Sequence, residues 1–237
     1  MITLIIPFYN ESKRLDRFEE GLNQYKNRNQ LIQEIILVND GSTDDTLPHL
    51  QKFQKQFSEK NIQIIHIEKN CGKGNALQTG ILQAQHNWVL CNDADLSYRL
   101  EQIDDWYDSK LFDLNKNGIV YFGKRIINDK KSKFFIHRII IGKIYFLLIK
   151  LILGINIQDT QCGFKLYPTA IAKEVFKDLQ EKRFAFDLEI IYKLIQQNYT
   201  IKTLPVHCID IEGSKVNLLK DSWNMFWALF RIRKLKR

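Results

Sequence analysis

Two aspartates separated by one residue are the strongest chemical signal in this sequence. Asp93 and Asp95 directly follow residues 88–91, a short apolar run that is typical of a buried strand. If the backbone turns there, both carboxylates can reach one divalent cation, because Mg²⁺ or Mn²⁺ takes one or two protein carboxylates and completes its coordination with phosphate oxygens and water. An acidic surface turn is the alternative interpretation, and the position after a strand favours a metal site.

A second polar cluster, residues 39–45, reads Asn-Asp-Gly-Ser-Thr-Asp-Asp and also follows an apolar run. Ser42 or Thr43 suits the N-cap of a following helix, and the later aspartates favour its first turn. Asp40 precedes that cap, so we expect it to point into the cleft. Its carboxylate could accept a hydrogen bond from a nucleobase N–H there.

A glycine-rich turn, residues 69–76, resembles a phosphate-binding loop but fits neither standard pattern. The nucleoside-triphosphate pattern requires Ser or Thr after Gly-Lys, which this turn does not supply, and the dinucleotide pattern requires a small residue where Leu77 stands. ATPase and dehydrogenase functions are therefore disfavoured. A glycine turn that enters a helix can still receive a diphosphate, and Lys73 could add a positive charge.

Apolar runs alternate with amphipathic stretches through the first half of the chain. We expect strands at residues 2–6, 34–38, 62–67 and 88–91, and helices at residues 12–25, 43–57 and 73–85. This alternation predicts an α/β fold with a mostly parallel sheet. Ligands of such sheets bind beyond the carboxyl ends of the strands, where residues 9–11, 39–42 and 93–95 all fall. These three clusters should meet in one site.

The second half is less regular. We expect strands at residues 118–123 and 200–206, and helices at residues 134–153, 187–197 and from about 220 onward. Neither an internal repeat nor a linker is visible in the sequence, so we predict one domain over residues 1–237.

The charge is unevenly distributed between the two halves. The chain carries 35 basic and 27 acidic side chains, a net charge of +8 and a pI of about 9.2. Residues 1–120 hold 13 basic and 17 acidic side chains, and residues 121–237 hold 22 and 10. The second half is therefore predicted to face an anionic partner, with nucleic acid, phosphate groups and an anionic membrane all open at this point.

The cysteines and the apolar stretches exclude other classes of protein. Four cysteines lie far apart with no Cys-x-x-Cys pair, so neither a zinc ribbon nor a disulfide framework is expected. Reduced thiols in a cytosolic protein fit this pattern better. The N-terminus reaches Pro7 and Glu11 too soon for a signal peptide or a membrane anchor. The longest apolar stretch, residues 139–155, contains Lys143 and Lys150, so no membrane span is expected.

Taken together and in this order, the polar clusters resemble the inverting glycosyltransferases of family 2, which have a GT-A fold. The segments that carry this resemblance are residues 7–11, 38–42, 72–74 and 93–95. Residues 159–165 (Asp-Thr-Gln-Cys-Gly-Phe-Lys), 183–187 and 212–215 look like the polyprenyl-phosphate branch, and most like dolichyl-phosphate β-glucosyltransferases and their prokaryotic relatives. The resemblance covers nearly the whole chain, and residues 159–165 are its most specific part.

The resemblance implies a role for each matching residue. The residues expected to bind the nucleotide-sugar are Pro7, Tyr9, Glu11, Asp40, Lys73, Asp93 and Ala94. Lys73 is included for the positive charge that it could add. Asp93 and Asp95 would bind Mg²⁺ or Mn²⁺. Arg125 would lie near the reacting phosphates. Arg138 and Lys215 match basic positions that bind the acceptor phosphate or else the donor phosphate. Residues 1–120 would then form the donor half and residues 121–237 the half that faces the acceptor and the membrane.

Two departures from the family pattern concern the acceptor contacts. Lys124 stands where the family usually has a serine before Arg125. Gly142 stands where a serine often follows Arg138 by four residues.

The implied reaction transfers a hexose, with glucose expected, from a UDP-sugar to a polyprenyl phosphate. A phosphate monoester has a second pKa of about 6, so the acceptor is largely dianionic at pH 7 and needs little help from a general base. The metal would neutralise the leaving diphosphate while basic side chains hold the acceptor in line, and one displacement would give a β-linked product. Asp159 is expected near the acceptor as an orienting residue or a base. The alternative is a loop partner for Arg183 or Lys165.

Two segments predict a peripheral contact with the cytoplasmic face of a membrane. Residues 134–155 are mostly apolar, and Lys143 and Lys150 share one face, which fits a helix in the membrane interface, or else a core helix with snorkelling lysines. Near the C-terminus, aromatic residues at helical spacing are followed by a basic tail, which favours anionic lipid. The aromatic residues are Trp223, Phe226, Trp227 and Phe230, and the basic residues are Arg231, Arg233, Lys234, Lys236 and Arg237.

Other functions remain as alternatives. A family 2 enzyme with a glycan or lipid-linked oligosaccharide acceptor is one, and UDP-galactose, UDP-N-acetylglucosamine or GDP-mannose are alternative donors. A nucleic-acid binder is suggested by the pI alone, and the sequence contains no recognisable module for it. A sugar-phosphate nucleotidyltransferase would need a glycine-rich loop with an arginine after the first strand, where residues 7–11 stand. The sequence predicts no oligomeric state.

Overall fold

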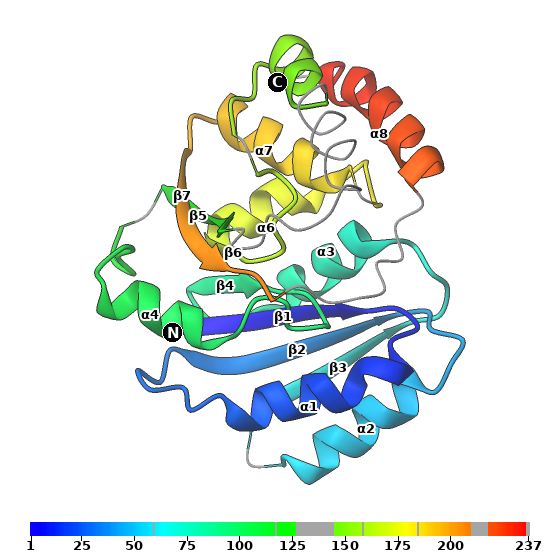
Figure 1. Cartoon of the computed structure of the whole chain (residues 1–237), viewed down its shortest axis with the longest axis vertical. Helices are drawn as coiled ribbons and strands as arrows, with labels where there is room; N and C mark the ends of the chain where they lie inside the picture. The colour runs from blue at the N-terminus through cyan, green and yellow to red at the C-terminus, as the bar shows by residue number, and fades with distance from the viewer. Residues whose placement is uncertain are drawn as a thin grey trace.

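The computed structural model describes residues 1–58, 60–116, 118–126, 145–157, 159–183, 185–209 and 218–235, with the backbone alone in residues 218–223. The described strands form one seven-stranded sheet in the order β3-β2-β1-β4-β6-β5-β7. Helices cover both faces of this sheet (Figure 1). The α/β architecture with a mostly parallel sheet that the sequence predicts is confirmed.

The first four strands are parallel. They are β1 (Ile2–Phe8), β2 (Ile32–Asp40), β3 (Ile62–Ile67) and β4 (Trp88–Cys91). Each lies within a few residues of its predicted position. Their apolar residues run almost without interruption because both faces of the sheet are buried.

The other three strands extend the sheet beyond β4. They are β5 (Ile119–Ile126), β6 (Lys165–Pro168) and β7 (Thr200–His207). β6 runs antiparallel to both β4 and β5, whereas β5 and β7 are parallel to each other. Because β4 pairs with β6, one sheet joins the two predicted halves of the chain. β6 was not predicted as a strand, since four residues that begin with a lysine give little periodic signal.

The helices divide between the two faces of the sheet (Figure 1). One face carries α1 (Leu15–Gln24, preceded by a 3₁₀ turn at Ser12–Arg14), α2 (Thr46–Gln56) and α4 (Glu101–Asp108). The opposite face carries α3 (Lys73–Gln83), α6 (Thr169–Lys177), α7 (Phe186–Gln196), α8 (Leu218–Arg233) and a helix at residues 145–153. Both α4 and α6 were missed in the sequence.

The expected amphipathic helices are described in part. Of the helix expected at residues 134–153, residues 134–144 lie outside the described part of the chain, and residues 145–153 are helical. α8 buries Ala228, Leu229 and Ile232, whereas Trp227 is 48% exposed and Phe230 39% exposed. Among the described residues, no helix is both long and apolar enough to span a bilayer.

Gly80 sets how closely α3 approaches the sheet. A Cβ at this position would lie 2.7 Å from Ile5 Cγ2 and 3.1 Å from Val38 Cγ2. We expect Gly80→Val to lower the free energy of unfolding by about 1–3 kcal/mol, because extra atoms in a close-packed interface force the backbone apart. Urea denaturation measures this. The exposed neighbour Gln83→Val is the control, and an equal loss in both variants would contradict the close-packing explanation.

Candidate active site

The predicted polar clusters all follow the carboxyl ends of strands. Residues 9–11 follow β1, and Asp93 comes shortly after β4. Asp40 is the last residue of β2, and Arg125 is the last residue but one of β5. These strands run in the same direction, so their carboxyl ends share one edge of the sheet. The structure therefore brings the clusters of both halves of the chain to one edge.

The loop after β1 is held by residues that follow β2. The backbone N–H of Asn10 donates to Ser42 Oγ at 2.9 Å, and the N–H of Thr43 donates to Asn10 Oδ1 at 2.8 Å. The N–H of Glu11 donates to Thr46 Oγ1 at 2.8 Å. The prediction that Ser42 or Thr43 caps the helix is wrong, because α2 begins only at Thr46 and these two side chains serve the neighbouring loop.

The residues predicted to hold the uridine lie on this loop. Pro7 is half-buried near the end of β1, and Tyr9 is 41% exposed. Glu11 forms an ion pair with Arg14, at 2.8 Å between Oε2 and Nε. Their contacts with a nucleotide stay predictions.

Asp40 is almost completely buried and binds the glycine turn. Its carboxylate accepts hydrogen bonds from the backbone N–H groups of Cys71 (3.0 Å) and Gly72 (2.7 Å), and from Asn70 Nδ2 (3.1 Å). Gly41 has a φ of +65°, and a Cβ there would lie 2.5 Å from the Asn70 backbone nitrogen. Asp40 thus orders residues 70–72, and its predicted contact with a nucleobase stays a prediction.

The N-terminus of α3 already has a partner from the protein. The N–H groups of Gly74 and Asn75 donate to the carbonyl oxygen of Lys182, at 2.8 and 3.3 Å. These two groups are therefore already hydrogen-bonded within the protein, and diphosphate binding at the glycine turn stays a prediction.

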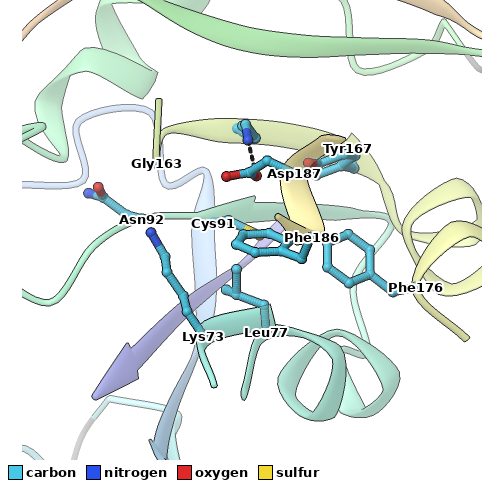
Figure 2. Close-up of a pocket in the computed structure, with 10 residues that line it drawn as sticks. Lys73, Leu77, Cys91, Asn92, Gly163, Tyr167, Phe176, Phe186 and Asp187 are labelled. Atoms are coloured by element: carbon cyan, nitrogen blue, oxygen red, sulfur yellow. Dashed lines mark hydrogen bonds and ion pairs between the residues drawn. The ribbon is translucent and has the colours of Figure 1, made fainter. Parts of the chain in front are cut away.

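Lys73 itself points to the site and pairs with Asp93. Burial alone would lower the pKa of Lys73, but the attraction of Asp93 and Asp187 outweighs it and raises the pKa, so the ammonium stays charged. Figure 2 shows Lys73 reaching from α3 toward Asn92 at the edge of a small cavity.

The turn after β4 carries the predicted metal ligands. Asp93 pairs with Lys73, and Ala94 packs partly buried against the core. Asp95 Oδ1 accepts hydrogen bonds from the N–H (2.9 Å) and Oγ (2.6 Å) of Ser97. Leu96 has a φ of +47° and is buried against Gly21 of α1, which anchors the turn.

This turn fits Mg²⁺ or Mn²⁺ that shares its coordination with a diphosphate. No cluster of three or more His, Cys, Asp or Glu residues suitable for a metal is found within the part of the chain that the structure describes. Two carboxylates suffice when phosphate oxygens and water complete the coordination. Asp95 Oδ2 accepts no hydrogen bond from the described residues, so it is available as a ligand. The metal roles of Asp93 and Asp95 stay predictions.

Asp159 and Arg125 form a bidentate ion pair. Arg125 Nε and Nη2 each donate to one oxygen of Asp159 at 2.9 Å, and the Arg125 backbone N–H donates at 3.1 Å. Burial alone would lower the pKa of Arg125, but Asp159 outweighs it and raises the pKa. The expected alternatives, Arg183 and Lys165, are not the partners of Asp159. Since its carboxylate accepts three N–H groups, orienting Arg125 suits it better than proton abstraction.

Residues 159–165 lie between the ends of β4 and β5. A Cβ on Gly163 would collide with the Asp93 carboxylate, and a Cβ on Gly123 would lie 2.7 Å from Cys162 Sγ. The Gly123 N–H donates to the carbonyl of Phe164 at 2.8 Å. The segment therefore joins the predicted metal site to the strand that carries Arg125.

The sequence analysis did not predict a buried ion pair that lies beside this segment. Lys165 and Asp187 are almost fully buried and pair with each other (Figure 2 labels Asp187). Lys165 Nζ also donates to the Thr160 carbonyl at 3.1 Å. The sequence signal for this pair was a charged residue within a mostly apolar stretch, at Lys165 and again at Asp187. Arg138 and Lys215, the predicted acceptor contacts, lie outside the described residues.

The fold defines the class of protein. Glucosyl-3-phosphoglycerate synthase from Mycobacterium tuberculosis, in complex with Mn²⁺, UDP and glucosyl-3-phosphoglycerate, matches 98% of this chain and 79% of its own at a TM-score of 0.67 and 14% identity. S. aureus TarS, residues 1–349, matches 98% of this chain and 64% of its own at a TM-score of 0.62 and 20% identity. The chain thus has a GT-A glycosyltransferase fold.

The family follows from the sequence comparison. The model described as glycosyl transferase family 2 matches residues 3–176, and the chain belongs to this family of glycosyltransferases. A dolichyl-phosphate beta-glucosyltransferase of Trichomonas vaginalis is 34% identical over 228 residues, 92% of this chain and 68% of that protein. The human dolichyl-phosphate beta-glucosyltransferase is 30% identical over 230 residues, 91% of this chain and 69% of that protein.

Asp44 makes the loop network sensitive to acid. Burial alone would raise its pKa, but hydrogen bonds from Thr46 and Ser12 outweigh burial and lower the pKa to about 2. A lowered folded-state pKa stabilises the protein above the unfolded pKa of about 4, and this stability is lost as the pH falls toward 2. We expect the free energy of unfolding of the wild type to exceed that of Asp44→Asn at pH 6, and this difference to shrink by about 1 kcal/mol between pH 6 and pH 3.

Urea denaturation at several pH values measures this advantage. Asp45→Asn, an exposed neighbour, is the matched control and should show a smaller change with pH. An advantage of wild type over Asp44→Asn that is constant from pH 6 to pH 3 would exclude the role given to Asp44.

Proposed function

We propose that this chain transfers glucose from UDP-glucose to a polyprenyl phosphate of the dolichyl type, with inversion at the anomeric carbon. The observation that carries this proposal is the extent of the similarity. Proteins named dolichyl-phosphate beta-glucosyltransferase are 29–34% identical over 91–98% of this chain. The similarity therefore includes the second half, where the acceptor contacts are expected.

The donor and the metal are inferred from the site and from the structural neighbours. UDP is bound in the M. tuberculosis synthase, together with Mn²⁺, and UDP-N-acetylglucosamine in S. aureus TarS. In this chain Asp93 and Asp95 would hold Mg²⁺ or Mn²⁺, which would neutralise the leaving diphosphate. Pro7, Tyr9 and Glu11 would surround the nucleotide.

The described residues support the acceptor step by electrostatics. The acceptor phosphate is largely dianionic at pH 7, so it reacts without a strong base. Arg125, oriented by Asp159, would hold this dianion in line with the anomeric carbon. Lys73 would add a fixed positive charge on the donor side, beside Asp93.

We also propose peripheral association with the cytoplasmic face of a membrane. The helix at residues 145–153 and α8 lie together, because the Tyr145 hydroxyl donates to the Met225 carbonyl at 3.5 Å and Arg233 donates to the Ile152 carbonyl. Among the side chains that the structure describes on this pair of helices, four large apolar ones are exposed. They are Leu147, Leu151, Trp227 and Phe230. Exposed Lys150 and Lys234 suit anionic headgroups, whereas Arg231 pairs with Glu181.

A donor panel tests the proposed reaction. Purified protein with Mn²⁺ or Mg²⁺, a short polyprenyl phosphate and UDP- or GDP-sugars should yield a glycolipid from UDP-glucose. Asp95→Ala should lower the rate on the order of 100-fold, because the leaving diphosphate loses stabilisation. Asp16→Ala, an exposed aspartate on α1, is the matched control. UDP binding without lipid product would indicate another acceptor, and no nucleotide binding would refute the proposed activity.

Vesicle flotation tests the membrane contact. The protein should float with vesicles that contain phosphatidylglycerol, and higher salt should weaken the binding. Replacing both Leu151 and Trp227 by serine should lower the binding at least about tenfold. Burying each of these apolar side chains in the bilayer contributes about 1.5–3 kcal/mol to the free energy of binding. Leu82→Ser on α3 is the control for a lost exposed leucine. Undiminished flotation of the double variant would contradict the proposed surface.

A further inference from the structure

The loop between α6 and α7, residues 178–183, lies against the glycine turn of the site. The carbonyl oxygen of Lys182 accepts the N–H groups of Gly74 and Asn75 at the start of α3. A Cβ on Gly72 would lie 2.5 Å from the same oxygen. The position of this one carbonyl therefore determines where the turn ends and where Lys73 leaves the backbone.

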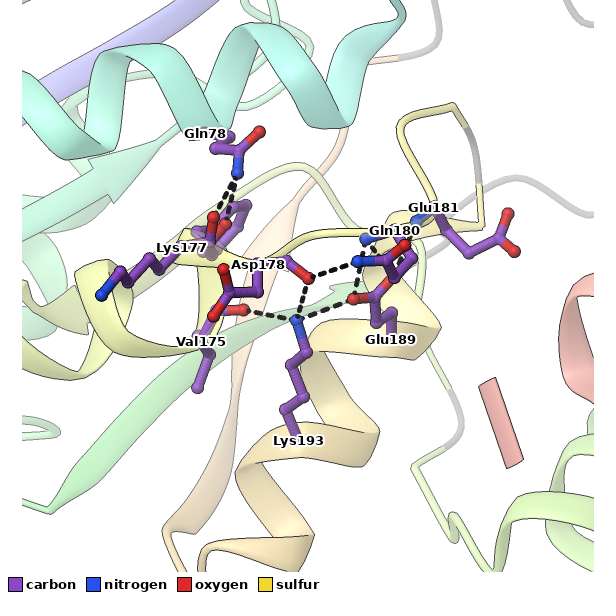
Figure 3. Close-up of polar contacts among 9 residues, drawn as sticks. Gln78, Val175, Lys177, Asp178, Gln180, Glu181, Glu189 and Lys193 are labelled. Carbon is purple, nitrogen blue, oxygen red and sulfur yellow. Dashed lines mark hydrogen bonds and ion pairs between the residues drawn. The ribbon is translucent and has the colours of Figure 1, made fainter. Parts of the chain in front are cut away.

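A buried carboxylate on α7 holds this loop. Glu189 is fully buried, and both of its oxygens accept the backbone N–H of Gln180 at 3.0 Å, while Oε2 also accepts the N–H of Glu181 at 2.7 Å. Lys193 Nζ balances the charge at 2.7 Å from Oε1 (Figure 3). Glu189 thus fixes the two residues that directly precede Lys182.

The end of α6, which leads into this loop, is held by α7 and by α3. Lys193 Nζ donates to the carbonyls of Val175 (3.1 Å) and Asp178 (3.0 Å), and Gln78 Nε2 donates to the carbonyls of Phe176 (2.7 Å) and Lys177 (2.8 Å). Figure 3 shows Gln78 reaching from α3 to these carbonyls. The loop therefore starts from a fixed point, because the carbonyls just before it and that of Asp178 are bonded to α3 and α7.

We propose that Glu189 is a positioning residue for the donor site. Through the backbone of residues 180–182 it sets the glycine turn, and the turn sets Lys73 beside Asp93. This inference rests on the proposed function, since it takes Lys73 and Asp93 to meet the donor diphosphate. Glu189 itself acts only through the loop.

Glu189→Gln tests this role, because it keeps the shape of the side chain and removes its charge. We expect the KM for UDP-glucose and the Kd for UDP to rise about tenfold, with kcat and the KM for polyprenyl phosphate within about twofold. Amide hydrogen exchange at Gly74 and Asn75 should accelerate about tenfold. A variant that merely folds less well would lower kcat and leave both KM values unchanged.

Glu174→Gln is the matched control, because this exposed carboxylate of α6 accepts only the Tyr199 hydroxyl among the described residues. It should change none of these quantities. Gly74→Ala tests the same contact from the side of α3, since a Cβ there would lie 2.6 Å from Phe186 Cβ and 3.0 Å from the Lys182 oxygen. It should reproduce the rise in the Kd for UDP, and it serves if Glu189→Gln does not fold.

The outcomes separate this inference from the proposed function. Unchanged UDP affinity and unchanged exchange at Gly74 and Asn75 in Glu189→Gln would overturn the positioning role. If wild type binds no UDP, the proposed function fails, and the exchange rates alone decide whether Glu189 orders the turn. An equal rise in the KM for both substrates would also overturn it, because the proposed effect passes through the glycine turn and Lys73, which lie on the donor side.

Discussion

The arrangement of the site depends on one buried ion pair, Lys165 with Asp187. Each charge is almost completely removed from water, and neither would be stable there without the other. Lys165 begins β6 and Asp187 lies in the first turn of α7, so the pair joins the antiparallel strand to the helix behind it. With Lys165 held, the residues before it place Gly163 against Asp93 and Asp159 against Arg125.

Close backbone approach is the second constraint on the site. Gly41, Gly72 and Gly163 each lie where a Cβ would collide with backbone or with a carboxylate. These contacts let the loops after β2, β3 and β4 and the segment before β6 meet at one edge of the sheet. Side-chain charges that are far apart in the sequence then come within hydrogen-bonding distance, as Lys73 does with Asp93.

Much of the fold could be predicted from local patterns. The strand at 62–67 was predicted with its observed bounds, and so was the strand at 88–91, because each is a short apolar run between polar turns. β6 could not be predicted, because its stability comes from pairing with β4 and β5 and not from its own four residues. The helix α2 was predicted, but its first residue was not. It begins at Thr46 because Ser42 and Thr43 form hydrogen bonds with the loop after β1.

The sequence by itself determined the α/β class, the parallel strands and the clusters at their carboxyl ends, because period and strand-end composition are local properties of the chain. Only the tertiary structure decided the partners. Asp159 pairs with Arg125, 34 residues away, and Asp40 binds the backbone of the glycine turn. Such pairs depend on which strands are neighbours in the sheet, and the placing of β6 between β4 and β5 is a property of the packed core as a whole.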